Sequence, residues 1–343
     1  MKELLPQILQ WTGEKKPFAI ARVIQTWGSS PRPVGSALII SADGEMAGSV
    51  SGGCVEGSVV KEAKQIISIA EGKRLSYGVS DDEAWAVGLT CGGKVQIYLQ
   101  TYPSSDSVQS NVWTTLQKFL SENKSCVLIT ALTDGESRNT LIDSRGKVLG
   151  TSLPDEVIVS AKEAYTKRRH DSLTVGGVEY FIQVFPKRSC LLIIGAAHIT
   201  ADLVRLAALY DFETWVIDPR GAFTNRTQFA TAPDHRLEKY PSEVLSEIEL
   251  DEYTYAVILS HDPKIDDNAL HVLLRSKVAY IGALGSRKTH EKRIERLRHA
   301  GFSEDEVKKI ESPIGMDIHA QGAREIALSI MGSLIRVKNS FLT

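Results

Sequence analysis

The sequence predicts an α/β protein with two domains, on three observations. The chain has 343 residues, which exceeds the usual size of a single domain. Its first half contains two similar arrangements of strands, turns and a helix, and its second half alternates buried strands with helices. We therefore expect an N-terminal α/β domain over residues 1–186 and a C-terminal α/β domain over residues 190–343.

Composition and charge argue against several classes of protein. Hydrophobic residues make up 43% of the chain, which is ordinary for globular cores. Lysine plus arginine (40) nearly balances aspartate plus glutamate (42), so we expect no nucleic acid and no membrane as partner. The first eleven residues read as a short charged helix, without the apolar run of a signal peptide, which favours a cytoplasmic protein. The four cysteines are too widely spaced for disulfide or zinc motifs and are expected to be free thiols: Cys54, Cys91, Cys126 and Cys190.

The first half of the chain predicts an internal duplication. Residues 141–151 (LIDSRGKVLGT) resemble residues 39–49 (IISADGEMAGS), and each segment reads as a strand, a tight turn and a glycine. The two degenerate copies span residues 18–103 and 125–186. Matches this short also arise by chance, which is the alternative interpretation.

A glycine-rich loop at residues 48–58 is the most distinctive feature of the first copy. It follows a buried strand and precedes a helix expected over residues 55–70. Such a loop leaves backbone N–H groups free at the positive end of the helix dipole, so Gly52 and Gly53 are predicted to line an anion cradle. Cys54 is expected in the first helical turn, where the pKa of a thiol can fall to roughly 3.5–7.5.

The second copy helps to choose between two interpretations of this loop. In one, the glycines only shape a turn and Cys54 is a small apolar residue; in the other, Cys54 is a functional thiol. The second copy keeps the scaffold but has LPDE at 153–156 where the first has SGGC at 51–54, and Val175 where the first has Cys91. This difference favours a function for both thiols. The candidate residues of this site are Gly52, Gly53, Cys54, Cys91 and Gly92.

The C-terminal half predicts a doubly wound parallel sheet of the Rossmann type. An apolar strand at 190–194 runs into Gly195 and a helix, and the next strand ends at Asp218. The spacing from Gly195 to Asp218 is 23 residues, close to the ~20 of dinucleotide-binding folds. The turn departs from the G-x-G-x-x-G pattern, because Ala197 and Thr200 stand where the second and third glycines are expected. The pattern therefore favours the fold more strongly than it favours NAD binding.

Polar residues follow several further strands of this domain. The carboxyl ends of parallel strands open onto one crevice, which is the usual ligand site of such sheets. The segment 285–287 begins a helix and is a second candidate phosphate cradle, although each residue alone can also be a helix cap or a solvated charge. The candidate cofactor-binding residues of the crevice are Gly195, His198, Asp218, Arg220, His261, Asp262, Gly285, Ser286, Arg287, Gly315 and Asp317.

Together these motifs resemble the XdhC/CoxI family, the accessory proteins of xanthine dehydrogenase and related molybdenum hydroxylases, over nearly the whole chain. One departure is Ala197, where the family usually has a second glycine. The matching segments are 28–35 (GSSPRPVG), 48–57 (GSVSGGCVEG), 88–93 (GLTCGG), 260–262 (SHD), 280–287 (YIGALGSR) and 312–318 (SPIGMDI).

The resemblance implies a chaperone with no turnover reaction of its own. Such proteins bind the molybdenum cofactor, a molybdopterin or its nucleotide form, and protect it while a cysteine desulfurase supplies a terminal sulfur. They then insert it into the apo-hydroxylase. On this resemblance Cys54, assisted by Cys91, would contact the molybdenum end or guard the sulfido group. A homodimer is the default expectation for such a protein.

An NAD(P)-dependent oxidoreductase is the alternative function. It rests on the Gly195–Asp218 unit, with His261 and Asp262 as an acid/base pair. The missing second glycine argues against it, because a side chain there hinders the approach of the backbone to a pyrophosphate.

Overall fold

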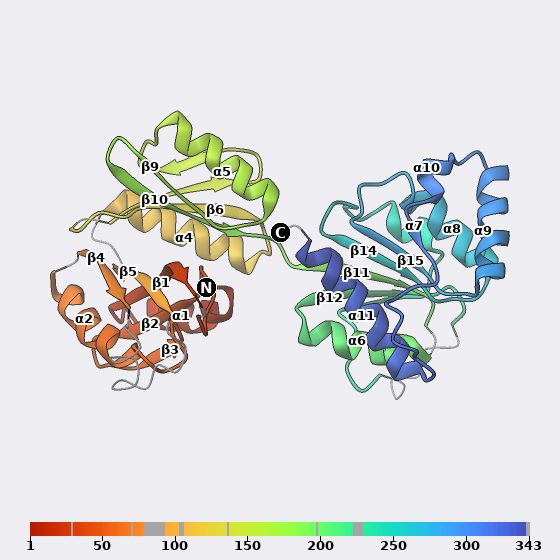
Figure 1. Cartoon of the computed structure of the whole chain (residues 1–343), viewed down its shortest axis with the longest axis horizontal. Coiled ribbons are helices and arrows are strands. Elements are labelled where there is room, and N and C mark those ends of the chain that lie inside the picture. The colour runs from red at the N-terminus through yellow and green to blue at the C-terminus, as the bar shows by residue number, and fades with distance from the viewer. Residues whose placement is uncertain are drawn as a thin grey trace. The chain divides into compact units, whose positions relative to one another are not determined.

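The computed structural model divides the chain into two compact units, Met1–Lys187 and Arg188–Thr343 (Figure 1). The structure describes residues 1–28, 30–69, 71–78, 93–102, 106–135, 137–196, 198–221 and 229–340. Both units mix helices and strands, so the predicted α/β class is confirmed. None of the helices within these ranges is long and apolar enough to span a membrane.

The first part of the N-terminal unit forms a five-stranded antiparallel sheet in the order β3-β2-β1-β5-β4. Buried side chains of α2 pack on one face of this sheet, and those of α1 pack on the other. The elements are η1 (Lys2–Leu4), α1 (Leu5–Gly13), β1 (Phe18–Trp27), β2 (Ala37–Ser41), β3 (Met46–Gly48), α2 (Glu56–Ile69), β4 (Gly72–Tyr77) and β5 (Lys94–Tyr102).

The second part repeats this arrangement with the strand order β8-β7-β6-β10-β9, again antiparallel. In chain order, each of the strands β1 to β5 has the same place in the first sheet as the corresponding strand of β6 to β10 has in the second. These equal orders support the predicted duplication, which stays a prediction about the origin of the unit. The elements are α4 (Ser107–Ser121), β6 (Cys126–Ala131), β7 (Arg138–Asp143), β8 (Val148–Gly150), α5 (Asp155–Lys167), β9 (Asp171–Val175) and β10 (Val178–Phe185).

A fully buried arginine joins the two sheets. Arg22 of β1 donates from Nη2 to Gln100 Oε1 (2.6 Å) and Thr130 Oγ1 (2.8 Å), and from Nη1 to Gln183 Oε1 (3.3 Å). Gln100 and Gln183 occupy matching positions on β5 and β10. Burial lowers the pKa of Arg22 to about 10, because the charged form loses its hydration.

The C-terminal unit contains a six-stranded parallel sheet in the order β13-β12-β11-β14-β15-β16. This is the 3-2-1-4-5-6 order of a Rossmann sheet, so the predicted doubly wound fold is confirmed. Helices α6 and α11 cover one face, and α7, α8 and α9 pack on the other (Figure 1). The elements are β11 (Ser189–Ile194), α6 (His198–Leu209), β12 (Phe212–Ile217), β13 (His235–Leu237), α7 (Pro241–Leu245), β14 (Thr254–Ile258), α8 (Pro263–Leu273), β15 (Tyr280–Ala283), α9 (Arg287–His299), α10 (Glu304–Val307), β16 (Ile310–Glu311) and α11 (Ala323–Asn339).

The strand order places a topological switch point between β11 and β14. From β11 the chain proceeds to β12 on one side, and β14 then continues the sheet on the other side. Ligands of open α/β sheets bind outside the carboxyl ends of the strands at this point. Ile194 and Ile258 are register partners at the ends of β11 and β14, so the candidate ligand-binding residues at the switch point are those that follow them.

Candidate functional site

The glycine-rich loop of the N-terminal unit binds a carboxylate of its own chain. Glu56 Oε1 accepts from Ser49 Oγ (2.7 Å) and from the N–H groups of Val50 (3.2 Å) and Ser51 (2.9 Å). Glu56 Oε2 accepts from the Ser51 hydroxyl and from the Gly53 N–H (2.9 Å). The expectation of free N–H groups in this cradle is therefore wrong for Val50, Ser51 and Gly53, because Glu56 already fills it.

Two glycines give the loop its shape. Gly52 and Gly53 have φ values of +76° and +115°, which non-glycine residues rarely adopt. Helix α2 consequently begins at Glu56, whereas helix α5 of the second copy begins at Asp155, which matches Gly53. Burial raises the pKa of Glu56, but hydrogen bonds from Ser51 and Ser49 outweigh it and lower the pKa to about 2.

Cys54 lies just before helix α2 rather than inside its first turn. Its side chain is partly buried and packs against the core cluster that includes Val55 and Val59. The flanking Gly53 and Val55 N–H groups are held by Glu56 and Ser51, so the backbone on both sides of the thiol is fixed. The other predicted residues of this site, Cys91 and Gly92, lie outside the described residues.

Cys126 has a different environment from Cys54. It is fully buried in β6, and burial raises the pKa of its thiol to about 12. A thiol that stays protonated is a poor nucleophile and a poor metal ligand. Cys126 is therefore a core residue.

In the C-terminal unit, Gly195 sits at the switch point and permits close contact between two loops. Its φ is +100°, and a Cβ atom on it would lie 2.5 Å from both Cα and N of Ser260. Ser260 follows β14, so the turn after β11 and the turn after β14 touch here. Only glycine fits this position.

Asp218 and Arg220 lie beside this contact. Asp218 is 5% exposed; its Oδ2 accepts from the Ala196 N–H (2.9 Å) and from Arg220 Nη2 (2.7 Å). Its Oδ1 accepts from the N–H (3.0 Å) and Nε (2.9 Å) of Arg220. Burial raises the pKa of Asp218, but these hydrogen bonds, led by those from Arg220, outweigh it and hold the pKa below its usual value.

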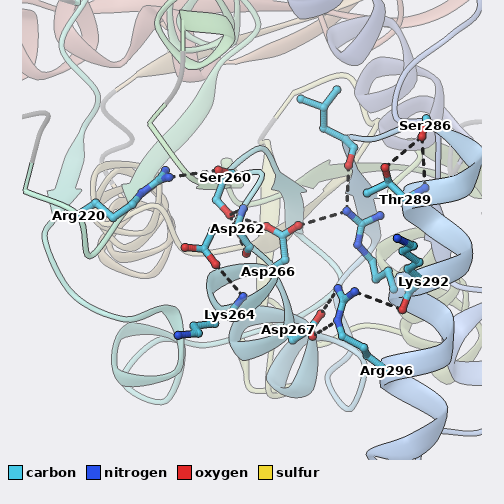
Figure 2. Close-up of polar contacts among 12 residues, drawn as sticks. Arg220, Ser260, Asp262, Lys264, Asp266, Asp267, Ser286, Thr289, Lys292 and Arg296 are labelled. Atoms are coloured by element: carbon cyan, nitrogen blue, oxygen red, sulfur yellow. Dashed lines mark hydrogen bonds and ion pairs between the residues drawn. The ribbon is translucent and has the colours of Figure 1, made fainter.

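A chain of polar contacts crosses the carboxyl ends of β12, β14 and β15 (Figure 2). Arg220 Nη1 donates to Ser260 O (3.3 Å), and Ser260 Oγ donates to Asp266 Oδ1 (2.5 Å). Arg293 Nη2 pairs with Asp266 Oδ2 (3.2 Å) and donates to Leu284 O (2.9 Å). The structure thus connects the loops after β11, β12 and β14 with Arg293 in the middle of α9.

The remaining predicted residues of the crevice mostly shape loops. Ser286 caps α9 by accepting the Thr289 N–H (3.2 Å), and Asp262 caps α8 by accepting the Lys264 N–H (2.9 Å). The exposed His261 has φ +59°, a left-handed backbone that is strained for histidine. Four others have simpler settings: His198 begins α6, Gly285 has φ +141°, the exposed Arg287 begins α9, and Gly315 has φ +93°. Asp317 is exposed and accepts the His319 N–H (3.2 Å).

The structure also contains a cavity of about 770 Å³ at the starts of α6 and α11 that sequence reasoning largely missed. Only His198 among its lining residues was predicted. Arg205 lies seven residues after His198, two turns along the same helix face, and this spacing is the signal that could have found it. The other lining residues are Ala201, Asp202, Phe229, Ala230, Gly322, Ala323, Arg324 and Glu325.

Comparisons with protein families agree with this geometry. The XdhC Rossmann domain matches residues 191–334, and the XdhC and CoxI family matches residues 11–78. The chain belongs to the XdhC/CoxI family. The resemblance inferred from the sequence is thereby confirmed, and the family's Rossmann domain contains both the switch point and the cavity.

Named relatives of this XdhC/CoxI protein cover nearly its whole length. A Bacillus subtilis protein named as a probable xanthine dehydrogenase subunit is 24% identical over 95% of this chain and 94% of its own. The "molybdenum cofactor insertion chaperone PaoD" of Escherichia coli is 23% identical over 94% of this chain and 84% of its own. A crystal structure of a Bacillus halodurans protein described as a xanthine dehydrogenase is 26% identical, with a TM-score of 0.76, over 99% of this chain and 96% of that one.

Proposed function

We propose that this XdhC/CoxI protein is an accessory factor that binds the molybdenum cofactor and inserts it into a xanthine dehydrogenase or a related molybdenum hydroxylase. The observation that carries the proposal is the similarity, over 94% of this chain, to a chaperone named for molybdenum cofactor insertion. The similarity to a protein named for xanthine dehydrogenase supports a client of that type. A cysteine desulfurase partner and a homodimer remain expectations drawn from the family resemblance.

The described side chains suit the organic part of this cargo. The cofactor is a pterin with a phosphate, and the C-terminal unit offers arginines for the phosphate at the switch point and in the cavity. Within the described residues, no three His, Cys, Asp or Glu side chains are grouped to hold a metal ion. We therefore expect the C-terminal unit to bind the cargo mainly through its pterin and phosphate. Cys54 of the N-terminal unit is a separate candidate for a sulfur contact to the cargo.

Cargo analysis tests this function directly. The protein would be purified from a host that makes the cofactor and from an isogenic host that cannot, and molybdenum and pterin would be quantified by metal analysis and mass spectrometry. We expect both in the first preparation and neither in the second. Equal, background levels in the two preparations would contradict the proposal.

Replacing Cys54 by alanine is expected to lower activation of an apo-hydroxylase at least tenfold while leaving the fold intact, because the proposed sulfur contact to the cargo is lost. The measurement is hydroxylase activity after incubation with cofactor-loaded protein. Cys190→Ala is the matched control, since Cys190 is also a partly buried cysteine. Full activation by the Cys54 variant would refute a role for this thiol.

An NAD(P)-dependent oxidoreductase is the second candidate, favoured by the 3-2-1-4-5-6 strand order. Against it, both carboxylate oxygens of Asp218 already accept hydrogen bonds from Ala196 and Arg220. An acid at the end of this strand would have to accept a ribose hydroxyl to bind NAD. Saturable, micromolar binding of NADH or NADPH in a titration would favour this candidate.

A further inference from the structure

Asp218 has the sequence position of a ribose-binding acid but a different set of contacts. It is 5% exposed, and each of its two oxygens accepts two hydrogen bonds, one oxygen from Ala196 and Arg220 and the other from Arg220 alone. Both oxygens are thus directed at the β11–α6 turn and at the arginine. Asp218 therefore holds Arg220 and the turn together.

Arg220 is the group that this arrangement presents to solvent. Its side chain is 42% exposed, and its Nη1 reaches Ser260 O (3.3 Å), on the other side of the switch point (Figure 2). Gly195, which is in close contact with the same Ser260, carries no side chain. A planar guanidinium fixed along one edge leaves its remaining N–H groups for a bidentate acceptor.

We propose that Arg220 is the anion-binding residue of the switch-point crevice and that the crevice takes a phosphate-bearing ligand. Asp218 is then a positioning residue that orients Arg220, and the phosphate of the ligand replaces Ser260 O as the partner of Nη1. This inference deepens the proposed function, on which it rests for the identity of the natural ligand.

The strained backbone beside Arg220 supports a ligand site at this place. His261 directly follows Ser260 and has φ +59°. Left-handed conformations of non-glycine residues are costly and concentrate at binding and catalytic sites. The helix that follows the β11 turn, α6, has twelve residues and directs its positive end toward the same strand ends.

Titration with inorganic pyrophosphate at constant ionic strength tests the inference on the full-length protein. We expect saturable binding to the wild type, and binding about tenfold or more weaker to Arg220→Gln, because a charge-assisted bidentate contact is lost. Arg220→Lys, which keeps the charge but not the fork, is expected to bind with intermediate affinity. Arg296→Gln is the matched control, since Arg296 is 38% exposed and pairs with Asp267 through Nε and Nη2; it should bind like the wild type.

Three results would overturn the inference: no pyrophosphate binding by the wild type, equal binding by wild type and Arg220→Gln, or equal losses in Arg220→Gln and Arg296→Gln. Failure of the proposed function is recognised separately, by absence of molybdenum and pterin from wild-type protein made in a competent host. If the protein binds pyrophosphate through Arg220 but carries no molybdenum or pterin, the anion site is supported and the proposed cargo is refuted.

Discussion

Replacing Asp266 by alanine is expected to lower the free energy of unfolding of the C-terminal unit by about 3–5 kcal/mol, because it leaves a buried cation without its counter-ion. The side chains of Asp266 and Arg293 are 7% and 2% exposed. Nε and Nη1 of Arg293 are buried without a hydrogen-bond partner, so the carboxylate is its main compensation. Ser260 Oγ loses an acceptor in the same variant. The measurement is unfolding in urea, monitored by the hydrogen exchange of backbone amides in β14 and β15. These strands belong to the C-terminal unit, so their exchange reports on that unit alone.

The neighbouring Asp267 provides a matched control. It pairs with Arg296; the side chains of Asp267 and Arg296 are 19% and 38% exposed, so solvent screens this pair, and solvent-screened ion pairs contribute about 0–1 kcal/mol. Asp267→Ala should therefore lower stability by less than about 1 kcal/mol. The double variant Asp266→Leu/Arg293→Met, which removes both charges, should recover most of the loss. Equal effects of Asp266→Ala and Asp267→Ala would contradict the assignment of a buried pair.

The sequence predicted the fold of the C-terminal unit well, but it could not predict this pair. Apolar strands that end in glycine or polar residues identify a parallel sheet, because a strand buried on both faces must be continuously apolar. Arg293 lies in a helix so rich in charge that its residues read as solvated. Its burial depends on Asp266 of α8, a residue that comes near it only when the two helices pack on the same face of the sheet.

The same limit applies to the candidate residues. The position of Asp218 at a strand end was readable from its spacing after Gly195, whereas its partners were not. Arg220 follows two residues later, and its guanidinium donates to the Asp218 carboxylate. The oxygens predicted to accept a ribose hydroxyl therefore accept hydrogen bonds from the protein itself. The local sequence predicts where along the sheet edge a side chain lies. The tertiary structure determines which hydrogen bonds that side chain makes.

In the N-terminal unit a local signal for the filled cradle was present. Glu56 follows Gly53 by three residues, the same spacing by which the glutamate of a capping box reaches back to a backbone N–H, although Glu56 is the first residue of α2. The prediction of an open anion cradle did not take this spacing into account, because glycine-rich turns before helices are usually interpreted as sites for external anions. The duplicated copy was informative here, since Ile158 occupies the position that matches Glu56 and helix α5 starts without such a loop.

Replacing Glu56 by glutamine is expected to open this loop and to speed alkylation of Cys54 several-fold. The carboxylate accepts five hydrogen bonds, and a glutamine amide accepts on one oxygen only and turns its NH2 toward the remaining donors. Loss of charge-assisted hydrogen bonds should lower stability by about 1.5–3 kcal/mol. Site-resolved mass spectrometry after iodoacetamide treatment measures the thiol, and Glu62→Gln on the same helix, whose partner Lys73 is 46% exposed, is the control.

The pH dependence separates the charge of Glu56 from its size. The folded pKa is about 2, below the ordinary value of 4.5, so the stabilisation is complete above about pH 5 and is lost as the pH falls toward 2. The difference in stability between wild type and Glu56→Gln should therefore shrink over this range. A difference that stays constant from pH 7 to pH 3 would contradict a charge-dependent contact.

An added carboxylate should repair a loop from which the side chain has been removed. Glu56→Ala leaves the Ser49 and Ser51 hydroxyls and three N–H groups facing an unfilled space, and formate is small enough to accept from them. Formate is therefore expected to slow Cys54 alkylation in Glu56→Ala, whereas an equal concentration of chloride is not. Because the wild-type loop already contains its carboxylate, formate should leave wild-type alkylation unchanged. If formate slowed both proteins equally, the cradle would not be the cause, and Glu56 would have no special role in fixing the thiol.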